Sequence, residues 1–268
     1  MLHYLQLEWK KFNKNAVFRV MAILYMVIMP GIFLLIQAIP KPAIAQMEMK
    51  SFFMFPNIWQ FLGFLGNWTV FFLFGFAMIL SITTEYSNKT LRQNIITGMT
   101  RRDFFLSKLT WAIALSFGAT LYYMLCCMLI GFFQTDTFYM SKFLQEIDFV
   151  PRYFLMSLGF MSVAMLFGLL FRRTGLALVL YLMYNIALEP LLRYGIHMRY
   201  FKNKSMHFYP MNSMEDLVPV PFIDMLEDFM AENKFTFLLE PTEAVVSASL
   251  YTVLIFGLCY LLLQKRDL

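Results

Sequence analysis

Charged residues are scarce in this chain of 268 residues. Asp, Glu, Lys and Arg make up 15% of the sequence, whereas hydrophobic residues make up 60% and the mean hydropathy is +0.61. A soluble domain carries roughly 25% charged residues. The composition therefore excludes an ordinary soluble globular protein and indicates a polytopic membrane protein.

Motifs that hold nucleotides, metals or nucleophiles are also missing. The sequence has no G-x-x-x-x-G-K-[ST] phosphate loop, H-E-x-x-H helix, C-x-x-C pair or G-x-S-x-G turn. The histidines fall outside the expected spans and are interpreted as surface or interfacial residues: His3, His197 and His207. The three cysteines fall within expected spans, so no disulfide framework is predicted. We predict a non-catalytic chain that binds no metal or other cofactor.

Charge is nearly absent from the middle of the apolar runs. Ion-coupled carriers normally place Asp, Glu, His or Arg within their spans. Glu189 and Arg193 lie near the end of one run, where an i, i+4 salt bridge is a more ordinary interpretation than an intramembrane catalytic pair. Energy for any transport is therefore expected to come from another chain. A carrier with sodium sites built from carbonyls and hydroxyls stays as the third alternative.

Six apolar runs are long enough to cross a bilayer. We predict an all-α polytopic membrane protein, forming a single transmembrane domain. Its spans are 17–39, 58–84, 109–133, 153–171, 175–190 and 244–263. Before the first span, residues 1–15 place Leu2, Leu5, Trp9 and Phe12 on one helical face, which predicts an interfacial helix. Between the second and third spans lies a polar loop, 85–108.

An external segment, 191–243, is expected before the sixth span. Phe222, Leu226, Phe229 and Met230 recur within it at helical spacing. We expect a short amphipathic helix here, lying on the outer leaflet or capping the exit of a path.

The distribution of basic residues predicts the orientation. With the N-terminus inside, the cytoplasmic segments hold 13 of the 22 basic residues and four of the 17 acidic ones. Cytoplasmic loops of membrane proteins carry the Lys and Arg excess. We therefore predict a multi-pass protein of the cell membrane with both termini in the cytoplasm. The basic residues behind the net charge of +5 are distributed according to the membrane topology, so this charge does not indicate a nucleic-acid partner.

The polar loop 85–108 contains a short amphipathic pattern. Leu91, Ile95, Ile96 and Met99 share one helical face. Basic residues surround that face: Lys89, Arg92, Arg101, Arg102 and Lys108. One interpretation is an interfacial helix resting on anionic headgroups. The other is a docking helix whose apolar ridge enters a groove on a cytoplasmic partner.

The loop resembles the cytoplasmic loop of the type-2 ABC transporter permeases. The residues that carry this resemblance are Glu85 at the end of a span, Thr90-Leu91-Arg92, Gly98, Arg101, and Lys108 before the next span. The family usually has Gly before the Thr. Lys89 stands at that position here. A lysine adopts the left-handed αL conformation at a higher energetic cost than Gly, which puts the geometry of the turn before the helix in question.

The resemblance implies a permease subunit of an ATP-driven exporter of lipids, peptides or drugs. It implies two copies of a separate ATPase subunit, which hold ATP and Mg, and a second permease copy, identical or related. The loop would carry the coupling helix that sits on the ATPase. The residues expected to couple to the ATPase are Glu85, Leu91, Arg92, Ile95, Ile96, Gly98, Met99 and Arg101. Glu85 is expected to pair with a nearby cation and to stiffen the link to the path.

Polar residues of the second and fifth spans are candidates for the lining of that path: Gln60, Asn67, Tyr181, Tyr184 and Asn185. The alternative is that they form ordinary hydrogen bonds between helices. A charge-poor path favours an apolar or amphipathic substrate. A function of a different class also remains open, that of a non-transporting membrane scaffold or immunity-type protein that binds partners and uses the basic loop as a headgroup anchor.

Overall fold

The computed structural model describes residues 2–38, 49–137, 139–201, 204–221 and 238–265. Helices make up the regular structure, and no strand occurs in these ranges. The amphipathic helix predicted around Phe222–Met230 lies outside the described residues.

Six helical stretches within the described ranges are long and apolar enough to cross a membrane, which confirms the predicted number of spans. Their parts are α2 (Ala16–Ala38), α3 (Ile58–Thr69) with η3 (Val70–Phe74) and α4 (Gly75–Ser87), α6 (Arg101–Gln134), α7 (Met140–Leu144) with α8 (Phe149–Phe171), α9 (Thr174–Met183) with its continuation, and α13 (Pro241–Lys265).

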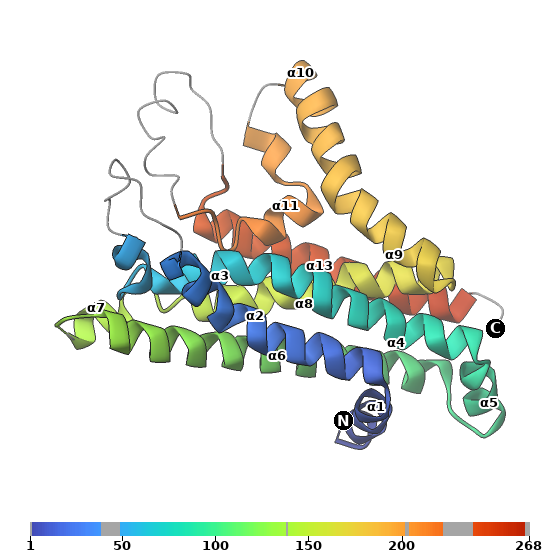
Figure 1. The fold of residues 1–268 in the computed structure, drawn as a ribbon. Helices are drawn as coiled ribbons and strands as arrows, with labels where there is room; N and C mark the ends of the chain where they lie inside the picture. Colours follow the sequence, from blue (N-terminus) through green and yellow to red (C-terminus); the bar gives the residue numbers. More distant parts are fainter. Residues whose placement is uncertain (1, 39–48, 138, 202–203, 222–237, 266–268) are drawn as a thin grey trace.

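Helix α8 lies at the centre of the bundle, in contact with α3, α4, α6, α9 and α13 (Figure 1). Its buried face includes Phe160 and Met165, which are fully shielded from solvent. Gly168 allows close approach to α4, because a Cβ there would lie 3.3 Å from Ile82. Helix α2, in contrast, leaves Val20 and Val27 more than half exposed, as expected for a helix that faces lipid.

The fifth spanning helix is longer than predicted. It continues from Thr174 to Tyr200, ten residues beyond the expected end at Pro190. A proline inside a regular α-helix lacks the N–H donor and clashes with the carbonyl one turn earlier. The backbone around Pro190 is instead π-helical, in η4 (Tyr184–Leu188) and η5 (Leu191–His197), before α10 (Met198–Tyr200). The wider π turn gives the ring room and lets the helix continue.

Short helical segments lie beside the spanning helices at both ends of the bundle (Figure 1). At one end, α1 (Leu2–Lys14) packs across α6, and α5 (Thr90–Ile96) connects α4 to α6. The C-terminal end of α13 lies at this same end. Toward the opposite end, η6 (Lys204–His207) and α11 (Pro210–Glu215) lie beside the start of α13.

Candidate functional site

The turn directly before α5 is the one whose backbone geometry was in question, because Lys89 stands where the family usually has Gly. Lys89 adopts the left-handed αL conformation, with φ 55° and ψ 16°, directly before the helix. This conformation costs about 1 kcal/mol for a residue that carries a side chain, whereas glycine adopts it freely. The αL conformation is therefore present before α5 although the chain has Lys89 instead of Gly.

Helix α5 ends in a Schellman motif built on Gly98. The N–H of Met99 donates to the carbonyl of Asn94 at 2.9 Å, and the N–H of Gly98 donates to that of Ile95 at 3.1 Å. Gly98 has φ 108°, a conformation that side chains rarely tolerate. Gly98 thus shapes the backbone that connects α5 to α6.

Helix α6 begins in a capping box. The hydroxyl of Thr100 accepts from the N–H of Asp103, and the Asp103 carboxylate accepts from the N–H of Thr100 at 3.0 Å. Tyr4 of α1 donates its hydroxyl to the other Asp103 oxygen at 2.6 Å. The exit of the loop is therefore fixed both to its own helix and to α1.

Arg101 extends from the first turn of α6 to the last turn of α13. Its Nη1 atom donates to the carbonyl of Leu263 at 3.1 Å and to that of Gln264 at 2.6 Å. The sequence placed Arg101 at the ATPase interface. In the structure this guanidinium holds the end of the sixth span.

The predicted apolar ridge of α5 mostly faces the bundle. Leu91 is 2% exposed and belongs to the hydrophobic core, and Ile95 and Met99 are partly buried against that core. Ile96 is 76% exposed, with Arg92 exposed on the same side of the helix. Helical spacing identifies residues that share a face but not what covers them. Leu91 packs into the bundle in this structure, and its docking role stays a prediction.

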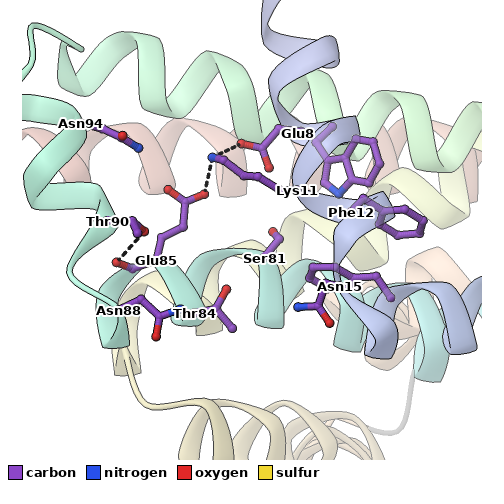
Figure 2. A pocket seen from close by; sticks show the side chains of 12 residues that line it. Glu8, Lys11, Phe12, Asn15, Ser81, Thr84, Glu85, Asn88, Thr90 and Asn94 are labelled. Atoms are coloured by element: carbon purple, nitrogen blue, oxygen red, sulfur yellow. Dashed lines mark hydrogen bonds and ion pairs between the residues drawn. The ribbon is translucent and has the colours of Figure 1, made fainter.

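A buried ion network lies beneath the loop. Lys108 is fully buried, and its Nζ atom lies 2.5 Å from Glu85 Oε1, 2.8 Å from Glu8 Oε2 and 2.9 Å from the carbonyl of Ser81. Lys11 contacts both carboxylates, at 2.9 Å to Glu85 and 3.1 Å to Glu8 (Figure 2). One cation was expected near Glu85, and two are present, Lys108 and Lys11. The network joins α1, α4 and α6.

Glu8, like Lys11, is a member of this network that the sequence did not reveal. It belongs to the polar side of an amphipathic helix, yet it is 2% exposed. Burial raises the pKa of Glu8, but the ammonium groups of Lys108 and Lys11 outweigh this effect and lower the pKa below its usual value. Burial lowers the pKa of Lys11, and both carboxylates raise it above its usual value. Both groups are therefore charged at neutral pH.

A cavity of about 330 Å³ opens beside the network, between α1, α4 and α5 (Figure 2). Its polar lining includes Lys11, Glu85 and the side chain of Asn94. One Glu85 oxygen, Oε2, is buried without a hydrogen-bond partner. The cavity lies where α5 meets the bundle.

The predicted path-lining residues are engaged inside the subunit. Tyr181 is fully buried, donates its hydroxyl to the carbonyl of Phe71 at 3.3 Å and stacks on the ring of that residue. Gln60 donates to the carbonyl of Pro219 at 3.3 Å. Asn67 and Asn185 are 4% and 7% exposed, and Tyr184 is half-buried. The contact of Tyr181 favours hydrogen bonding between helices in this conformation.

Glu189 and Arg193 serve a different purpose from the predicted salt bridge. Glu189 accepts from the N–H groups of Met211 at 3.1 Å and Asn212 at 2.8 Å, at the start of α11. Arg193 donates to the carbonyl of Met206 at 3.1 Å and lies 3.1 Å from Nδ1 of His207.

The two side chains therefore hold the segment after α10 against the fifth span. His207 is 1% exposed, so its prediction as a surface residue is wrong. Within the described ranges, no cluster of His, Cys, Asp and Glu could hold a metal ion.

Comparison with known proteins confirms the resemblance carried by the loop. The model of the ABC-2 family transporter protein matches residues 4–188, which include most of α1, the first four spans and the loop with α5. Among curated proteins, no match is found. Members of the family are multi-pass membrane components, typically non-catalytic, that work with an ATPase partner. The match covers more than half of the chain, which therefore belongs to the ABC-2 family of transporter membrane proteins.

Proposed function

We propose that the chain is the permease subunit of an ATP-driven exporter in the cell membrane. Helix α5 acts as the coupling helix and docks on a separate ATPase subunit, which holds ATP and Mg. Both termini lie in the cytoplasm with α5, and α1 lies along the membrane surface. Two ATPase copies and a second permease copy, identical or related, complete the transporter.

The exposure of Ile96 is the observation that carries this proposal. A large apolar side chain that is 76% exposed stands on a helix whose other apolar residues pack inward. Arg92 lies on the same exposed side. Such a short helix, with one apolar anchor and an adjacent cation, is suited to entering a groove on a protein partner.

The anchoring of α5 supports a mechanical role. The turn at Lys89 and the Schellman motif at Gly98 fix the helix between α4 and α6. Glu85 at the end of α4 and Lys108 in α6 form a buried ion pair. A movement of α5 is therefore passed to the second and third spans together, because the ion pair prevents their ends from separating freely.

An apolar or amphipathic substrate fits the spans best. The second span carries no charged side chain between Ile58 and Thr84. A hydrophilic ion would find no compensating charge there, whereas a lipid, an apolar peptide or a drug would need none.

The proposal is tested by affinity purification of the tagged chain from its native membrane, followed by an ATPase assay of the eluate. We expect Ile96→Asp to lower the retained ATPase at least about tenfold, because a charge in the apolar groove removes a central contact. Met140→Asp is the matched control, since Met140 is 63% exposed on α7 at the other end of the bundle.

Equal retention of the ATPase by wild type and Ile96→Asp would contradict the docking role of α5. Elution of the wild-type chain without any ATPase, from a membrane gentle enough to keep complexes, would instead support the non-transporting scaffold.

A further inference from the structure

We propose that Arg101 is a positioning residue that couples α5 to the sixth span, so that α13 carries movements of the loop to the opposite end of the bundle. This inference rests on the proposed function of α5 as the coupling helix. It adds a route through α13 to the one through the second and third spans.

The contact itself is well suited to transmit force. The last four carbonyls of a helix have no partner within that helix, and a cation at this end is favoured by the helix dipole. Arg101 supplies a hydrogen-bond donor to these carbonyls and a positive charge at this helix end. Its Nη1 atom lies 3.1 Å from the carbonyl of Leu263 and 2.6 Å from that of Gln264. Two hydrogen bonds to one helix end restrain its position more tightly than one.

The connection between Arg101 and α5 is short and held by backbone hydrogen bonds. The four residues between Ile96 and Arg101 contain the Schellman motif at Gly98 and the N-cap at Thr100. Their backbone hydrogen bonds leave little freedom between the end of α5 and the start of α6. A displacement of α5 therefore reaches the guanidinium of Arg101 with little loss.

Helix α13 is suited to act as a rod. It runs without interruption over 25 residues, roughly 37 Å, and its only proline is at the first position. Its other end is held by side chains of the segment beside α11: Lys204 lies 2.6 Å from Glu243 and 3.3 Å from Glu240. Tyr251 donates to the carbonyl of Phe208 at 2.7 Å. Figure 1 shows α13 reaching from the α5 end of the bundle to the region of α11.

A single reporter at the far end of α13 tests this route. Phe208 is 37% exposed, and Phe208→Cys keeps the backbone carbonyl that accepts from Tyr251. The native thiols at Cys126, Cys127 and Cys259 are buried. The rate at which a membrane-impermeant maleimide labels the new thiol is measured on the complex with its ATPase, with and without a non-hydrolysable ATP analogue.

We expect the ATP analogue to change the labelling rate at least about threefold. Arg101→Gln should abolish the change while the ATPase stays bound, because the side chain no longer bridges two carbonyls. Arg101→Lys should restore part of the change, since one ammonium can still reach a carbonyl. The control is Arg173→Gln, an exposed cation in the turn between α8 and α9, which should leave the change intact.

Three results would overturn the inference. An ATP-dependent change that persists in Arg101→Gln would show that α13 does not need this contact. No change in the otherwise unaltered reporter would show that α13 carries no movement, and loss of the ATPase from Arg101→Gln would make Arg101 a docking residue. Absence of the ATPase from the wild-type eluate would refute the proposed function itself.

Discussion

Replacing Lys108 by Met removes the fully buried ammonium that contacts both Glu8 and Glu85. Met has a similar length and fills the space, so the change isolates the charge. Two carboxylates, 2% and 5% exposed, would then remain in the interior with Lys11 as their compensating cation.

The magnitude follows from the burial of the three groups. Removing one partner of a buried ion pair costs about 3–5 kcal/mol, because the remaining charge is left without compensation. Lys11 offsets part of this cost, but its side chain is 41% exposed, and a pair of this kind contributes about 1 kcal/mol or less. We therefore expect Lys108→Met to lower the free energy of unfolding by about 2–4 kcal/mol.

Glu85→Gln should cost less, about 1–2 kcal/mol, because the amide oxygen still accepts from Lys108 while Glu8 keeps its cation. The assay is equilibrium unfolding by SDS in mixed micelles, followed by tryptophan fluorescence. Lys14→Met, at the exposed end of α1, is the control and should change the free energy of unfolding by no more than about 0.5 kcal/mol. If Lys108→Met were as stable as this control, the ion network would not hold α1, α4 and α6 together.

Three further predictions concern the backbone of the loop and the far end of the bundle. Lys89→Gly should raise the free energy of unfolding by about 0.5–1 kcal/mol in the same SDS titration, because glycine relieves the αL conformation; a destabilised variant would contradict this. Gly98→Ala should lower it by about 1–2 kcal/mol, since φ 108° strains any side chain, and an unchanged unfolding midpoint would argue against the Schellman motif. Burial raises the pKa of Asp216 from 3.8 to about 7, so the folded state holds its proton more tightly than the unfolded state does. Stability should therefore fall as pH rises from about 4 to 7, and this slope should flatten in Asp216→Asn; parallel pH profiles for the two proteins would show that Asp216 does not titrate in this way.

The number of spans could be predicted from the sequence because the bilayer imposes it. Apolar runs of about 20 residues without charge have few alternatives to a membrane helix. The family resemblance was also accessible, since Gly98 acts through local backbone geometry that sequence spacing preserves. At the turn before α5, residue type and conformation disagreed, because Lys89 adopts the αL region that favours glycine.

The contacts of the loop could not be predicted, because they join residues far apart in the chain. Lys108 lies 100 residues from Glu8, and Arg101 lies 162 residues from Leu263. A single sequence gives no indication of such pairs. The inward face of Leu91 was missed for a related reason, since the interior of the bundle and a groove on a partner are both apolar.

Site-specific photocrosslinking at position 96 tests the central claim, the docking of α5 on an ATPase, most directly. A benzophenone amino acid placed at Ile96, which is 76% exposed, is irradiated in native membranes, and the crosslinked chains are identified by mass spectrometry. The account predicts a crosslink to an ATP-hydrolysing subunit from position 96 and none from Met140 at the other end of the bundle. Crosslinks from position 96 to lipid alone would contradict it and make α5 a headgroup anchor.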